Sequence, residues 1–362
     1  MRIGVDASRS VVRPRTGTEN YSYHLIRELL ALGRAHDYTL YFNKPPAPDD
    51  FAPGRAEHRV IPLPRLWTHV RLSAEMAARP PDVLFVPSHV LPAVHPRRSV
   101  ATIHDLGYLY WPKAHPLARR WYLHLATLFN ARASSRVIAD SQTTADDLTR
   151  RYRVSQDKIA VIHLGCGPEY RPPSAEAVAS IRSRYAVPER YVLAVGTIQP
   201  RKNLGRLVEA FLQVRRAVGD AVLVLVGKPG WGAEPVLRQV ASSGSAVRIL
   251  GYVPDRDMPA LLGGAEALAF PSLYEGFGLP ALEAMACGTP VVCANNSSLP
   301  EIVGEAGLLV PPTEVDAMAG ALILLLEDPA LREEMRRRGL ERAAGFTWRR
   351  CAESTLDLLE SV

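Results

Sequence analysis

The sequence predicts an α/β protein built from two Rossmann-like halves. Segments typical of buried strands alternate with amphipathic helical segments along most of the 362 residues, which is the pattern of parallel sheets covered by helices. The length suits two domains of ordinary size. A glycine- and proline-rich stretch at 165–174 separates the two halves and is typical of a linker.

The first half opens with a buried strand at 2–6, a loop that ends at Gly17, and a helix at 19–32 with Thr18 as its expected N-cap. The loop holds no G-x-G-x-x-G, so it is not a dinucleotide-binding turn. Residues 44–64 are rich in proline and charge and are expected to form a loop. Further strands are expected at 38–43, 82–86, 99–104, 136–140 and 158–164, and helices at 117–133 and 143–152.

In the second half, a strand at 191–195 leads through Arg201 and Lys202 into a helix at 204–214. Two adjacent cations between a strand end and a helix start indicate an anion-binding loop, because Lys supplies a point charge and Arg a bidentate fork. The later elements are expected as strands at 221–226, 247–253 and 307–310, and as helices at 315–327, 330–344 and 349–359.

Residues 270–294 (FPSLYEGFGLPALEAMACGTPVVCA) are the most informative stretch. They predict a strand, a glycine loop, a helix at 279–286 and a second strand, with Pro280 in the first helical turn and Gly288 at the C-terminal cap. The loop amides and the helix dipole would face an anion beyond the strand end. A carboxylate beside bound phosphate binds neutral hydroxyls, so Glu275 and Glu283 indicate a nucleotide sugar. A plain turn with solvated glutamates is the alternative.

The run EGFGLPALE at 275–283 resembles the E-x7-E signature of retaining glycosyltransferases of family 4, and the resemblance extends over nearly the whole chain. It implies the GT-B fold, which has two Rossmann-like β/α/β domains with a central cleft and a C-terminal helix that crosses back to the N-terminal domain. The implied domains are 1–170 for the acceptor, 171–345 for the nucleotide sugar, and 346–362 for the returning helix.

The resemblance also implies roles for residues of the second half. Glu275 would contact the donor sugar, and Glu283 would hold the ribose hydroxyls. Lys202 and Arg201 would bind the diphosphate and stabilise it as the leaving group. Many members carry an Arg where this chain has Thr197, so Arg201 either replaces that Arg or is solvated. The backbone amides that would meet the sugar and diphosphate are those of Gly276, Phe277, Gly278 and Leu279.

In the first half, the resemblance places Gly17 close to the donor diphosphate. It places His104, within ATIHDLGYLYWP at 101–112, against a sugar hydroxyl. Asp255 and Asp257 look like a metal-binding D-x-D, but Pro254 and the helix that follows favour helix capping instead. Members of the family need no metal, so neither a cofactor nor a metal is expected.

The expected reaction is hexosyl transfer, with anomeric retention, from a GDP-mannose or UDP-glucose type donor to a hydroxyl of a glycan or lipid-linked saccharide. No carboxylate is placed as a nucleophile. The departing phosphate would take the acceptor's proton while Lys202, Arg201 and the loop amides hold the diphosphate, once domain closure has brought His104 to the donor. A UDP-sugar 2-epimerase of the same fold and a non-catalytic sugar-nucleotide-binding subunit are the alternatives.

The composition limits the partners and the cellular location that can be expected. Residues 1–170 carry 23 Lys and Arg against 15 Asp and Glu, and the remainder carries 20 against 22. A basic first half suits a phosphorylated acceptor or an anionic membrane surface, with a solvated arginine-rich face as the alternative, while no stacking-aromatic motif supports nucleic-acid binding. With no membrane span or signal peptide expected, and four cysteines in no metal spacing, a cytoplasmic enzyme is predicted, with a peripheral membrane contact left open.

Overall fold

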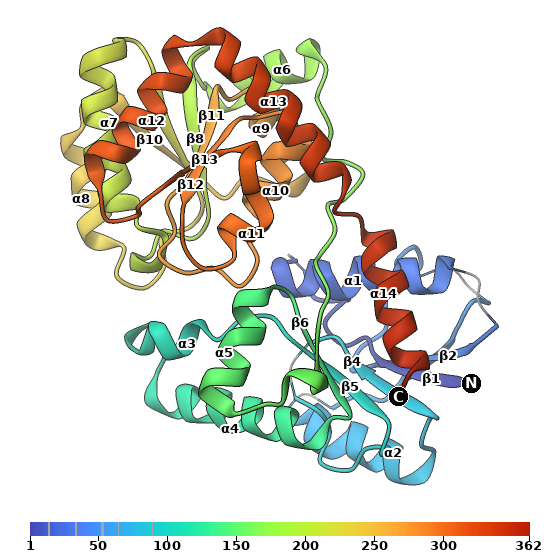
Figure 1. Cartoon of the computed structure of the whole chain (residues 1–362). Coiled ribbons are helices and arrows are strands. Elements are labelled where there is room, and N and C mark those ends of the chain that lie inside the picture. Colours follow the sequence, from blue (N-terminus) through green and yellow to red (C-terminus); the bar gives the residue numbers. More distant parts are fainter. Residues whose placement is uncertain (14, 33–34, 52–53, 64, 89) are drawn as a thin grey trace. The chain divides into compact units, whose positions relative to one another are not determined.

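The computed structural model describes all residues of the chain except 14, 33–34, 52–53, 64 and 89. The chain divides into two compact units. Unit 1 comprises Met1–Gly165 and Thr347–Val362, and unit 2 is Cys166–Phe346. Each unit is a parallel sheet with helices on both faces (Figure 1), as the alternating pattern predicts.

Unit 1 has a seven-stranded sheet with the order β3-β2-β1-β4-β5-β6-β7. The order reverses between β1 and β4, because the chain first adds strands on one side of β1 and then on the other. The strands are β1 (Arg2–Asp6), β2 (Asp37–Phe42), β3 (Glu57–Val60), β4 (Val83–Val86), β5 (Ser99–Ile103), β6 (Arg136–Ala139) and β7 (Ile159–Val161).

The helices of unit 1 lie on both faces of its sheet, α1 and α14 on one side and α2 and α4 on the other (Figure 1). The returning helix α14 packs on α1, where the Trp348 ring stacks on His24 with centroids 5.2 Å apart. The C-terminal helix therefore crosses back to unit 1, as predicted. The helices are α1 (Gly17–Ala31), α2 (Ser73–Ala78) after the π-helical turn η1 (Thr68–Leu72), α3 (Gly107–Tyr110), α4 (Leu117–Ala133), α5 (Gln142–Tyr152) and α14 (Trp348–Glu360).

Unit 2 has a six-stranded sheet with the order β10-β9-β8-β11-β12-β13, which reverses between β8 and β11. Its strands are β8 (Tyr191–Val195), β9 (Val222–Val226), β10 (Val247–Gly251), β11 (Ala267–Phe270), β12 (Val291–Ala294) and β13 (Leu308–Val310). Its helices are α6 (Ala175–Tyr185), α7 (Leu204–Val218), α8 (Glu234–Ser242), α9 (Met258–Gly263), α10 (Leu279–Ala286), α11 (Leu299–Val303), α12 (Val315–Glu327) and α13 (Pro329–Ala344). Leucines and valines of α7, α12 and the strands form its main apolar core.

The structure corrects two expectations about single elements. The stretch 44–64, expected as a loop, contains β3, a polar edge strand that pairs with β2 and has no apolar alternation to reveal it. Helix α1 begins at Gly17 with Thr16 as N-cap, and Glu19 accepts the Thr16 N–H at 3.1 Å, so Thr18 is not the cap.

The chain passes between the two units at two points, Gly165–Cys166 and Phe346–Thr347. Cys166 donates its backbone N–H to the Phe346 carbonyl at 3.0 Å. Gly165 lies so close to the other segment that an added Cβ would be 2.0 Å from the Trp348 nitrogen. The two passing segments are therefore in backbone contact, and only glycine fits at position 165.

We expect Gly165→Ala to lower the melting temperature, because its methyl group meets backbone that must move, at a cost of about 1–3 kcal/mol. Gly320→Ala is the matched control. Gly320 lies inside α12 with open space around its Cβ position, so alanine there stabilises the helix by about 0.5–1 kcal/mol. Thermal unfolding of both variants measures the two signs, and a Gly165→Ala protein as stable as the wild type would contradict the close approach.

Candidate active site

Two basic residues and one buried glutamate meet where the sheet of unit 2 reverses its strand order. The loop after β8 carries Arg201 and Lys202 in a 3-10 turn, and the loop after β11 carries Glu275. These two strands are neighbours in the sheet. The carboxyl ends of parallel strands at such a reversal form the usual ligand crevice of an open α/β sheet.

Arg201 and Lys202 hold the Glu275 carboxylate between them. Lys202 Nζ lies 2.6 Å from Oε1, and Arg201 Nη1 lies 2.9 Å from Oε2. Arg201 Nη1 also donates to the Tyr274 carbonyl at 2.5 Å. Burial by itself would raise the pKa of the Glu275 carboxyl, but the two cations outweigh burial and hold that pKa below its ordinary value. At neutral pH the cluster is therefore a carboxylate between two cations, with one net positive charge.

Asn203 fixes the two loops of this cluster against each other. Its backbone is left-handed, with φ of +58°, a conformation that Asn tolerates better than most residues. Its side-chain nitrogen donates to the carbonyls of Pro271 at 3.1 Å and Pro312 at 2.6 Å. The Leu273 N–H donates to the Arg201 carbonyl at 2.8 Å. Sequence reasoning gave Asn203 no role, although an amide side chain directly after the basic pair was the available signal.

The glycine loop leads from Glu275 into the N-terminus of α10. Gly278 has φ of +112°, which glycine adopts without strain, and the Phe277 side chain is buried. The loop is pinned from α11, since Ser298 Oγ lies 2.6 Å from the Phe277 carbonyl. The first amides of a helix have no partner within that helix, and the dipole adds partial positive charge. The predicted segment Gly276, Phe277, Gly278 and Leu279 therefore offers an anion site beside Lys202 and Arg201.

Glu283 has different neighbours from Glu275. It is half-buried on α10, and the Tyr170 hydroxyl donates to its carboxylate. Burial raises the pKa of Glu283 to about 7, with Asp255 and Glu169 as further causes, and the Tyr170 hydrogen bond only partly opposes this.

In unit 1, His104 is paired with Asp140. The sequence predicts Asp140 at the end of a strand and assigns it no functional role. Nδ1 of His104 lies 2.7 Å from Oδ2 of Asp140. Ile103 of β5 is in register with Ala139 of β6, so the next residue of each strand leaves the sheet at the same edge. Burial disfavours the imidazolium, but the Asp140 carboxylate outweighs it and raises the pKa of His104. A strand-pairing argument from the sequence would have found this contact.

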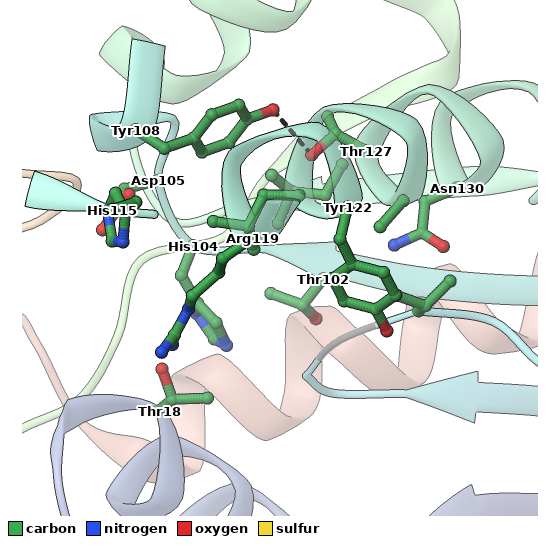
Figure 2. A pocket seen from close by; sticks show the side chains of 14 residues that line it. Thr18, Thr102, His104, Asp105, Tyr108, His115, Arg119, Tyr122, Thr127 and Asn130 are labelled. Carbon is green, nitrogen blue, oxygen red and sulfur yellow. Dashed lines mark hydrogen bonds between the residues drawn. The ribbon is translucent and has the colours of Figure 1, made fainter. Parts of the chain in front are cut away.

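His104 lines a pocket of about 310 Å³ in unit 1 (Figure 2). Thr18 of α1 and Thr102 of β5 contribute hydroxyls, and Arg119 of α4 extends its side chain into the same space. The pocket thus offers hydroxyl, imidazole and guanidinium groups to one space, which suits a polyhydroxylated ligand. Gly17 is exposed and adjoins Thr18 at the start of α1.

The comparison with known proteins identifies the family. A model described as "Glycosyltransferase Family 4" matches residues 15–170, and one described as "Glycosyl transferases group 1" matches residues 180–342. The O-antigen chain mannosyltransferase B of Escherichia coli is 36% identical over 265 residues, which cover 72% of this chain and 69% of that protein. The chain belongs to glycosyltransferase family 4. This chain is accordingly a glycosyltransferase.

One further sequence relative and one solved structure show how much of the chain is similar to known proteins. The serotype-specific mannosyltransferase WbdA of Escherichia coli is 30% identical over 321 residues, 80% of the glycosyltransferase but only 39% of WbdA. The solved structure of Anabaena Alr3699/HepE in complex with UDP and glucose superposes with a TM-score of 0.78 at 20% identity, with both chains covered in full. The structural likeness shows that the glycosyltransferase has the GT-B fold.

Asp257, the second aspartate of the D-x-D sequence, has a structural role in the glycosyltransferase. Asp257 accepts hydrogen bonds from Arg184 at 2.9 and 3.1 Å and from the Tyr185 hydroxyl at 2.6 Å. It makes no side-chain cap to the following helix, so the capping explanation is replaced by this ion pair. Within the described part of the chain no group of three or more His, Cys, Asp or Glu side chains is placed to hold a metal ion.

The raised pKa of Glu283 gives a stability prediction in the absence of ligand. The folded state binds a proton at Glu283 that the unfolded state releases above pH 4.5, so this group lowers stability progressively as the pH rises from about 4.5 to about 7. At pH 8 we expect Glu283→Gln to raise the free energy of unfolding by on the order of 1–3 kcal/mol, and with it the melting temperature. At pH 4.5 the melting temperature should be unchanged. Glu333→Gln, at an exposed position of α13, should change neither. Equal melting curves for Glu283→Gln and the wild type at pH 8 would refute the burial argument.

Proposed function

We propose that this glycosyltransferase moves a hexose, with retention of anomeric configuration, from a nucleoside diphosphate sugar to a hydroxyl of a glycan or lipid-linked saccharide. The observation that carries the proposal is the Lys202–Glu275–Arg201 cluster beside the N-terminus of α10. Relatives named as mannosyltransferases favour mannose as the hexose and hence GDP-mannose as the donor. The UDP and glucose of the HepE complex make UDP-glucose the second donor to test.

In this proposal the protein acts on the departing diphosphate. As the bond from the anomeric carbon to the phosphate oxygen breaks, negative charge grows on the diphosphate, and Lys202, Arg201 and the α10 amides stabilise it. The acceptor hydroxyl attacks the same face of the sugar and passes its proton to the departing phosphate oxygen. Positively charged side chains and a helix dipole supply the stabilisation in this scheme, which has no step that needs a metal ion.

Glu275 has a double role in the proposal. Its carboxylate holds both cations within 2.9 Å, which fixes their positions before the donor arrives. A diphosphate that attracts the same cations loosens this pairing and leaves carboxylate oxygens for a hydroxyl of the donor sugar. Glu283 is assigned to the ribose hydroxyls, and His104, oriented by Asp140, to a sugar hydroxyl.

The first experiment is a donor screen. Pure protein is incubated with GDP-mannose, UDP-glucose and other nucleotide sugars, and released nucleoside diphosphate is measured. We expect slow hydrolysis of one donor, reduced at least a hundredfold in Glu275→Gln, because that variant keeps the side-chain shape but loses the charge that positions both cations. Glu333→Gln should retain full activity. Release that is equal in all three proteins would contradict the assignment, and release of an epimerised sugar would favour the epimerase.

Nucleotide binding separates the roles of the two glutamates. Lys202→Ala and Glu283→Ala should weaken the affinity for GDP or UDP roughly ten- to a hundredfold, because each loses a hydrogen bond to a charged group. Glu275→Gln should bind the nucleotide within a fewfold of the wild type, since both cations remain to attract the diphosphate and no carboxylate competes for them. Calorimetric titration measures all three, with Arg216→Ala, an exposed cation of unit 2, as the control. A uniform loss across the three variants would argue against this division.

A further inference from the structure

Helix α4 of unit 1 carries an apolar stripe on its exposed side. Leu117, Trp121, Leu125 and Phe129 follow one another at intervals of four residues, which places them on one face of the helix. Their side chains are exposed by 64, 56, 57 and 36%. We call these four residues the α4 stripe. Large apolar side chains that gather on one exposed face mark an interaction surface.

The turn η1 extends the stripe on one side. His69 Nε2 lies 3.2 Å from the hydroxyl of Tyr122, the α4 residue that follows Trp121. Leu66 and Val70, before and within this turn, are 66 and 52% exposed. Leu66 also has a left-handed backbone with φ of +57°, a strained conformation for a leucine. The exposed apolar surface therefore spans two elements that are far apart in the sequence.

The α4 segment and its flanks carry charge of one sign. Residues 106–139 contain no Asp or Glu, and their cations are Lys113, Arg119, Arg120, Arg132 and Arg136. Arg65 and Arg71 flank the η1 residues and are exposed. Long arginine side chains keep their charged ends in the polar layer while their stems lie along apolar surface. A helix with Trp, Leu and Phe on one face and cations around it is the kind that lies in the interface of an anionic bilayer.

We propose that the α4 stripe and η1 dock unit 1 on an anionic lipid bilayer. The apolar residues enter the boundary between headgroups and acyl chains, and the arginines contact lipid phosphates. A second copy of the chain fits less well, because a twofold contact through this face would bring the same cations against each other. None of the described helices is long and apolar enough to cross a membrane.

The His104 pocket shares a wall with this docking helix. Arg119 and Tyr122 of α4 line the pocket and stand within two residues of Trp121. An acceptor sugar that is anchored in the bilayer would thus reach the pocket along the helix that binds the lipid. The docking proposal goes beyond the transferase proposal and does not depend on it, because vesicle binding requires neither donor nor acceptor.

The test is sedimentation of the full-length protein with vesicles. We expect binding to vesicles of phosphatidylcholine with phosphatidylglycerol, release by added salt, and no binding to phosphatidylcholine alone. Leu125→Ser should reduce the partition coefficient at least tenfold, because it removes a leucine side chain from the apolar contact. The matched control is Leu324→Ser in unit 2, where the leucine is 49% exposed, and it should bind as the wild type does.

A double substitution of two arginines tests the electrostatic part of the proposed membrane contact. Arg65→Gln with Arg71→Gln should weaken binding to the anionic vesicles roughly 25-fold, about fivefold for each arginine, while Arg216→Gln with Arg238→Gln in unit 2 should not. Four results would overturn the proposal. They are no binding to anionic vesicles, equal binding to neutral ones, equal losses in the test and control variants, and a concentration-dependent dimer that Leu125→Ser disperses, which would assign the stripe to a second copy.

Discussion

The site of unit 2 depends on one buried ionic contact, that of Glu275 with Lys202 and Arg201. Removing charges from water is costly unless each charge finds a close partner. The contact holds together two loops that follow different strands. Asn203 and Ser298 stabilise these loops further by donating hydrogen bonds to backbone carbonyls. The cluster keeps one positive charge in excess at the end of a helix dipole, so the same arrangement that stabilises the loops prepares them for an anion.

Unit 1 also carries charged and polar side chains at its strand ends, but of different types from those of unit 2. Its strand ends present a histidine and an aspartate instead of a basic pair, and the Asp140 carboxylate fixes the orientation of the His104 ring through Nδ1. Tyr21 adds an edge-to-face contact to the same ring at 4.8 Å. The ring position is therefore set by three separate elements, β5, β6 and α1, without any ligand. Such preorganisation lowers the cost of binding.

The alternation of strands and helices was sufficient to predict two parallel sheets, and α4, α10 and α12 were predicted with the bounds that the structure shows. The polar edge strand β3 was missed because no apolar period marks it. Arg201, Lys202 and Glu275 were singled out by their motifs, but the pairing of Lys202 with Glu275 joins residues 73 apart and leaves no local pattern. The α4 stripe was ambiguous, because a periodic apolar face predicts a helix without telling whether another element covers it.

The return of α14 to unit 1 bears on how the chain folds during synthesis. Unit 2 is one continuous stretch, Cys166–Phe346, whereas unit 1 needs residues 347–362 to cover Tyr21 and His24 of α1 with Trp348. Domains generally fold in the order in which they leave the ribosome. Here the order is reversed for one helix. Unit 2 can fold as soon as Phe346 has been made, whereas unit 1 lacks α14 until residues 347–362 have been made. The nascent first half must therefore keep an apolar face of α1 open for the whole time that the second half takes to be made.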